Sequence, residues 1–111
     1  MWKMENQRDA FGKTLAELGR ERKDIVVLTA DLATSTKTNL FEKEFPERFF
    51  NFGVAEQNMF ATSAGLALSN KLPIVSTFAV FASGRALDQI RQSIAYSNLN
   101  VKIIATHGGV T

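Results

Sequence analysis

The run Ile25-Val26-Val27-Leu28 is apolar at every position and rich in β-branched residues. A short apolar run without alternating polar positions is typical of a strand that is buried on both faces of a parallel sheet. The polar stretch 29–37 follows directly and predicts a turn. The run therefore predicts a strand at the centre of the fold, with other elements packed on both of its sides.

The rest of the chain alternates between helical and extended patterns. Three further strands are predicted, at Phe49-Phe50, Leu72–Thr77 and Val101–Ala105. Helices are predicted at the N-terminus, at 38–45, at 56–68 and before the last strand. The first of them buries Met4, Phe11, Leu15 and Leu18 and stops at Gly19, and the last buries Ala86, Ile90 and Ile94. Such alternation predicts a doubly wound, mostly parallel α/β sheet of flavodoxin-like style, in one domain over residues 1–111.

Composition excludes several classes of function. The 111 residues suffice for one small core, and 45% apolar and 22% charged residues are ordinary for a globular protein. A net charge of +2 without a Lys/Arg block gives no reason to expect nucleic-acid binding. The absence of cysteine excludes disulfides and thiolate chemistry. No apolar run reaches the roughly 18 residues of a membrane span, and no signal-peptide core is seen, so a cytoplasmic protein is expected.

Residues whose side chains could bind a ligand or take part in catalysis lie where the predicted strands end. Ligands of open parallel sheets bind beyond the carboxyl ends of the strands. Asp31 follows the first predicted strand, Glu56 the second, Phe78 and Phe81 the third, and the only histidine, His107, the fourth. This convergence predicts a binding site at one rim of the sheet.

Each of these residues also has an ordinary interpretation. Glu56 could sit in the first turn of a helix, where the helix dipole favours a carboxylate. Asp31 could cap a loop. The two phenylalanines could belong to the core, and His107 could be a loop residue. Arg8, Arg85 and Arg91 could be solvated helix charges. Spacing alone leaves both interpretations open.

Four segments taken together resemble the pyrimidine-binding domain of transketolase. They are Thr29-Ala30-Asp31-Leu32, Asn51-Phe52-Gly53-Val54-Ala55-Glu56-Gln57-Asn58-Met59, Ser76-Thr77-Phe78-Ala79-Val80-Phe81 and Ala105-Thr106-His107-Gly108-Gly109. The resemblance extends from about Arg8 to Thr111. The Gly-x-x-Glu segment is shared with deoxyxylulose-phosphate synthase and with the β-subunits of 2-oxoacid dehydrogenases. The Asp-Leu, Phe-x-x-Phe and Thr-His segments, in this order, favour transketolase.

The resemblance implies a thiamine diphosphate site. Glu56 matches the glutamate that hydrogen-bonds atom N1′ of the pyrimidine ring and so activates the cofactor. Phe78 and Phe81 match the aromatic pocket around that ring, and Asp31 matches an acidic residue near the cofactor at the subunit interface. The family often has a tyrosine where this chain has Gly84. The pocket wall is therefore expected to differ there, or to be partly filled by Arg85.

The resemblance also implies a substrate site. Arg8 and Ser35 match groups that hold the sugar phosphate, and the neighbouring hydroxyl of Thr36 suits the same anion. An arginine can bind a phosphate through two parallel hydrogen bonds. His107 matches a histidine that faces the substrate and is the second expected catalytic residue.

The other half of the cofactor site is missing from the sequence. Thiamine-dependent enzymes usually carry a Gly-Asp-Gly segment that holds Mg²⁺ and the diphosphate, and this chain has none. The resemblance therefore implies a partner, the amino-half chain or domain of a transketolase, which would hold the Mg²⁺. No metal ligand is expected in this chain. The position of Met1 directly before the domain resembles split transketolases, and the chain is expected to be the front part of a carboxyl-half subunit, truncated within the domain.

The expected function is part of a transketolase, which moves two-carbon ketol units between sugar phosphates. The chain alone is expected to be inactive, to expose apolar surface and to form a homo-oligomer. Two alternatives remain open. One is a related thiamine-dependent enzyme, of the deoxyxylulose-phosphate synthase or 2-oxoacid dehydrogenase β-subunit type. The other is a non-catalytic α/β interaction domain.

Overall fold

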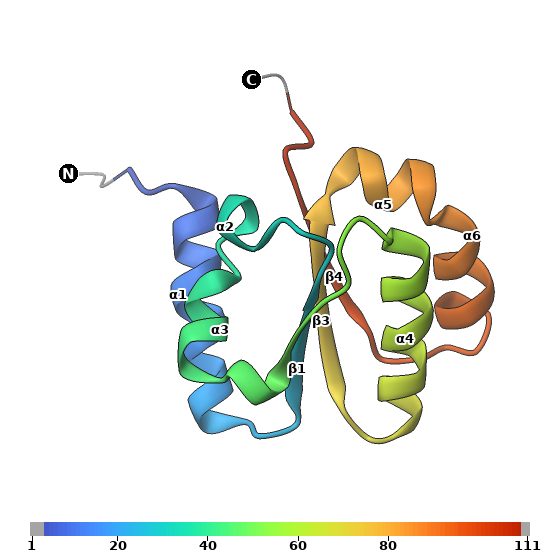
Figure 1. Cartoon of the computed structure of the whole chain (residues 1–111), viewed down its shortest axis with the longest axis horizontal. Coiled ribbons are helices and arrows are strands. Elements are labelled where there is room, and N and C mark those ends of the chain that lie inside the picture. Colours follow the sequence, from blue (N-terminus) through green and yellow to red (C-terminus); the bar gives the residue numbers. More distant parts are fainter. Residues whose placement is uncertain (1–3, 110–111) are drawn as a thin grey trace.

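The fold is a four-stranded parallel sheet with helices on both faces (Figure 1). The computed structural model describes residues 4–109. The strands are β1 (Ile25–Thr29), β2 (Phe49–Asn51), β3 (Leu72–Phe78) and β4 (Lys102–Thr106), and they lie in the order β2-β1-β3-β4. The predicted doubly wound α/β fold is confirmed, and its strand order is that of flavodoxin-like sheets.

The helices form two groups on opposite sides of the sheet. Figure 1 shows α1, α2 and α3 on one side and α4 and α6 on the other, while α5 lies above the end of β3. Their bounds are α1 Gln7–Glu21, α2 Ala33–Thr36, α3 Asn39–Glu44, α4 Glu56–Leu68, α5 Ala79–Arg85 and α6 Leu87–Gln89; a 3₁₀ turn, η1, spans Pro46–Arg48 and a π-helical turn, η2, spans Ile90–Ala95. The stretch 29–37, predicted to be only a turn, contains the single helical turn α2.

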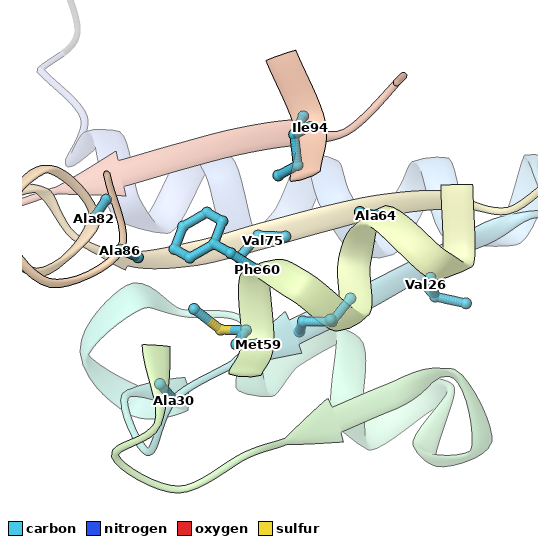
Figure 2. Packing of buried hydrophobic residues seen from close by; sticks show 10 residues of the cluster. Val26, Ala30, Met59, Phe60, Ala64, Val75, Ala82, Ala86 and Ile94 are labelled. Atoms are coloured by element: carbon cyan, nitrogen blue, oxygen red, sulfur yellow. The ribbon is translucent and has the colours of Figure 1, made fainter. Parts of the chain in front are cut away.

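Residues of β1 alternate between two hydrophobic clusters, one on each face of the sheet. Val26 and Leu28 belong to a cluster with Met59 and Phe60 of α4, which Figure 2 shows together with Val75 and Ile94. The other cluster contains Leu15, Ile25, Val27, Phe41, Phe49, Leu72 and Ile74. All five residues of β1 are buried. The apolar run of β1 is thus explained by burial on both faces.

The predicted buried face of the N-terminal helix is confirmed for Leu15 and in part for Phe11, which packs against the same cluster, but it is wrong for Met4 and Leu18. Its buried residues are Gly12, Leu15, Ala16 and Gly19. Met4 precedes the helix and is 96% exposed, and Leu18 is 42% exposed. Gly19 does not stop the helix, because α1 continues to Glu21. The two glycines instead allow α1 to approach α3 closely, a tertiary requirement that hydrophobic periodicity does not report.

We expect Gly19→Ala to destabilise the fold by about 1–3 kcal/mol through overpacking. A Cβ atom at Gly19 would lie 2.6 Å from Cε2 of Phe41, whose side chain is fully buried. Gly65→Ala in α4 is the matched control, because a Cβ there meets no atom within 4 Å. Alanine at such a helix position stabilises by roughly 0.5–1 kcal/mol. Urea denaturation should separate the two variants, and equal midpoints would contradict the close packing.

Several large apolar side chains are exposed, as the sequence predicts. Leu68, Val80, Leu87 and Tyr96 are between 60% and 86% exposed. The strand β4 pairs only with β3 within residues 4–109. Self-association through these surfaces stays a prediction. Within the same residues, no helix has the length and apolar character needed to cross a membrane.

Candidate cofactor site

The candidate site lies at the carboxyl ends of the strands. In Figure 1 the segments that follow the labelled strands β1, β3 and β4 all lie at the upper end of the molecule. The sheet order places the topological switch point between β1 and β3, because the chain moves from β1 to one edge and from β3 to the other. Ligands of doubly wound sheets bind in the crevice at this point.

Glu56 is a buried carboxylate at this rim. It is the first residue of α4 and is 4% exposed. Its Oε1 accepts a hydrogen bond from Nη1 of Arg85 at 3.2 Å. Its Oε2 is buried and has no hydrogen-bond partner among residues 4–109. The position in the first turn fits the helix-dipole interpretation, but a surface carboxylate would leave no such orphan atom. A buried acceptor without a partner is costly and points to an interaction with another group.

The loop before α4 sets the position of Glu56. Asn51 ends β2, and its Oδ1 accepts hydrogen bonds from the backbone N–H groups of Asp31 and Gly53, both at 2.9 Å. Gly53 has a φ of 67°, which glycine adopts without strain. The Phe52 N–H also donates to the Thr29 carbonyl at 2.9 Å. These bonds tie the loop to the end of β1. Sequence reasoning missed the role of Asn51, although an asparagine two residues before a glycine is typical of such a turn.

Phe78, Phe81 and His107 come together at the end of β3. Phe78 is the last residue of β3, and Phe81 lies in the first turn of α5. Their rings stack with centroids 5.5 Å apart and planes 18° apart. The His107 ring is 4.1 Å from that of Phe78, and the Thr106 hydroxyl lies 2.7 Å from Nδ1 of His107. The arrangement offers a flat apolar surface beside an exposed imidazole.

Arg85 connects the aromatic pair to Glu56. Its guanidinium carbon lies 4.0 Å from the centroid of the Phe81 ring while Nη1 bonds Glu56. The carbonyl of Arg85 accepts a hydrogen bond from Nε2 of Gln57 at 3.0 Å. Arg85 is therefore not a simple solvated charge. An open cavity of about 500 Å³ adjoins the Glu56–Arg85 ion pair. Its lining residues are Val54, Ala55, Glu56, Gln57, Asn58, Gly84 and Arg85.

The residues predicted to hold a sugar phosphate are only partly assembled. Nη1 of Arg8 donates to the backbone carbonyl of Ser35 at 3.1 Å, so the two residues are neighbours. Arg8 also shares an open cavity of about 710 Å³ with His107. The prediction for Thr36 is wrong. Its hydroxyl is buried, donates to the Leu32 carbonyl at 2.8 Å and lies 3.0 Å from the Thr38 hydroxyl, because α2 turns this side chain inward.

The carboxylate of Asp31 is exposed and makes no hydrogen bond or ion pair with another candidate residue among residues 4–109. The residue has a left-handed φ of 64° and an exposed side chain. Its backbone N–H donates a hydrogen bond to Oδ1 of Asn51. Nothing in the described part of the chain joins its carboxylate to Glu56 or to the aromatic pair. The same residues contain no group of three or more Asp, Glu or His side chains placed to hold a metal ion.

The local chemistry fits one end of a planar heteroaromatic ring. The orphan Oε2 of Glu56 could bond a ring nitrogen, and the Phe78–Phe81 pair offers a stacking surface. The cavity beside Glu56 gives access from solvent. The described residues thus fit the pyrimidine half of thiamine diphosphate.

Known proteins resemble this chain over nearly its whole length. The family model of the transketolase pyrimidine-binding domain matches residues 3–111. A protein of Methanocaldococcus jannaschii, provisionally named transketolase C-terminal section, is 58% identical over 94% of this chain and 33% of its own length. The 1-deoxy-D-xylulose-5-phosphate synthase of Mycolicibacterium gilvum is 39% identical over 92% of this chain and 16% of its own length.

A solved structure agrees with these sequence matches. It is described as a split gene transketolase in an inactive β4 tetramer, and it superimposes with a TM-score of 0.82 and 62% identity over 90% of this chain and 33% of that one. The chain thus spans about a third or less of the length of the relatives named here. Sequence match, strand order and superposition agree, and the chain belongs to the transketolase pyrimidine-binding domain family.

Proposed function

We propose that this chain is the pyrimidine-binding domain of a carboxyl-half transketolase subunit, which acts in a cytoplasmic assembly that transfers two-carbon ketol units between sugar phosphates. The single observation that carries the proposal is Glu56, a 4%-exposed carboxylate whose Oε2 has no hydrogen-bond partner within residues 4–109. Family membership supplies the matching group, the pyrimidine ring of thiamine diphosphate.

Glu56 is proposed to hold and move a proton at Oε2. When bound, thiamine diphosphate supplies a thiazolium that stabilises a carbanion. Because Oε2 has no partner among residues 4–109, a ring nitrogen of the bound cofactor could share one proton with it. Phe78 and Phe81 are proposed to stack on the ring and to keep water from this proton. The non-catalytic interaction domain is disfavoured, because a scaffold gains nothing from an orphan carboxylate oxygen.

The remaining site residues are proposed to act on the substrate and at the interface. Arg8 and Ser35 would bind the sugar phosphate, and His107 would face the reacting carbons from the cavity that it shares with Arg8. Asp31, exposed at the rim, would meet the cofactor once a partner covers that rim.

A second chain is proposed to complete the site. Mg²⁺ and the diphosphate would be held by the amino-half partner. The related solved structure is described as an inactive β4 tetramer, which supports both self-association and inactivity without that partner.

Reconstitution tests the proposal. The full-length subunit that carries this domain is mixed with a transketolase amino-half chain, thiamine diphosphate and Mg²⁺, and ketol transfer between sugar phosphates is followed. We expect activity only in the complete mixture. No transfer in the complete mixture, although the two chains associate, would contradict the proposal.

A second candidate is supported by the similarity to 1-deoxy-D-xylulose-5-phosphate synthase. Glu56 and the aromatic pair would have the same roles in both enzymes. The product distinguishes them: formation of 1-deoxy-D-xylulose 5-phosphate by the reconstituted assembly, in place of ketol transfer, would favour the synthase.

A further inference from the structure

Arg85 makes two contacts that together imitate a bound heteroaromatic ring. Its guanidinium is planar, lies 4.0 Å over the Phe81 ring and donates to Oε1 of Glu56 at 3.2 Å. An aromatic stack and a carboxylate hydrogen bond are also the two interactions that the proposed function assigns to the pyrimidine. Arg85 bonds Oε1 and leaves Oε2 free, but the guanidinium covers the face of Phe81 on which the ring would stack, so the two groups compete for that face.

The two side chains of the Arg85–Glu56 contact differ in how far they are buried. The Glu56 side chain is 4% exposed, whereas that of Arg85 is 50% exposed. Glu56 is fixed by its place at the start of α4, but the guanidinium can turn into solvent without disturbing the core. The moving partner of the pair is therefore Arg85.

Opening this contact without a ligand would leave both oxygens of the buried Glu56 carboxylate without a partner, which is costly. A ligand that bonds Glu56 as it enters offsets this cost. While the contact holds, it satisfies Oε1 of a carboxylate that would otherwise be buried without any partner. The contact thus stabilises the ligand-free site and still yields to a ligand that bonds both Glu56 and Phe81.

We propose that Arg85 is an internal latch that occupies the pyrimidine site until thiamine diphosphate displaces it. The latch lowers the apparent affinity for the cofactor, because only the fraction of molecules with an open site can bind. This inference rests on the proposed function, since it takes the cofactor to be the displacing ligand.

The test is cofactor affinity in the assembly with the amino-half chain and Mg²⁺. Isothermal titration of thiamine diphosphate is compared for the wild type, Arg85→Ala and Arg85→Met; methionine keeps apolar cover on Phe81 but cannot bond Glu56. Both variants should bind more tightly, by on the order of threefold to thirtyfold. Arg91→Ala is the matched control, because Arg91 is 71% exposed and pairs only with Asp88 among the described residues. The Arg91→Ala assembly should bind thiamine diphosphate with the affinity of the wild type.

The outcomes separate the latch from the proposed function. Unchanged or weaker binding by both variants, with normal binding by the wild type, would overturn the latch alone. A wild-type assembly that does not bind thiamine diphosphate would overturn both. A crystal structure of the cofactor complex gives an independent readout: the latch requires that Arg85 has left Glu56, and retention of the 3.2 Å bond beside a bound pyrimidine would refute it.

Discussion

Replacement of Glu56 by glutamine is expected to lower turnover of the reconstituted assembly by roughly 10²–10⁴-fold, the contribution of a general acid or base. Glutamine preserves the size of the side chain and can still accept a hydrogen bond from Arg85. It cannot bind and release a proton at the position of Oε2, the buried oxygen without a partner within residues 4–109. The expected loss is therefore in kcat, measured with the amino-half chain, thiamine diphosphate and Mg²⁺ present.

The control separates this loss from a change in net charge. Glu17→Gln removes a carboxylate from the exposed side of α1 and should leave turnover unchanged. Circular dichroism of both variants should match the wild type, since neither substitution changes packing volume. Turnover of Glu56→Gln close to the wild-type value would refute the assigned role.

The largest effect on stability is expected for Phe60→Ala. The Phe60 side chain is fully buried in the cluster between α4 and β3 that Figure 2 shows. Truncation of such a phenylalanine costs about 3–5 kcal/mol, because the cavity left behind does not collapse completely. That loss is a large part of the roughly 5–15 kcal/mol by which a domain is stable.

Amide hydrogen exchange of β1 and β3 measures this effect within the full subunit. The slowest amides exchange through global opening, so their rates should rise by about a hundredfold or more in Phe60→Ala. Val80→Ala serves as control because Val80 is 64% exposed, and its exchange rates should stay near those of the wild type. Equal protection in the two variants would contradict the central place of Phe60 in the core.

The sequence by itself determined the four strands, the longer helices and their order, but not the short helical turn α2. Burial on both faces leaves an apolar run at Ile25–Leu28 and a shorter one at the start of β3, so both strands could be recognised within single segments. Short-range periodicity likewise placed Ile94 on a buried face. The alternation of these elements was sufficient to predict a parallel sheet with its ligand rim, and the motifs at strand ends identified Glu56 and the aromatic pair as site candidates.

Only the tertiary structure decided which groups meet. Gly19 is a packing residue and not a helix stop, because Phe41 of another helix approaches it. The hydroxyl of Thr36 is buried and bonds the Leu32 carbonyl because of the course of α2. Arg85 and Glu56 are 29 residues apart, and neither segment carries a local signal of the other. Local patterns record the burial of one element, whereas such contacts depend on how two elements pack, and that information is not periodic in the sequence.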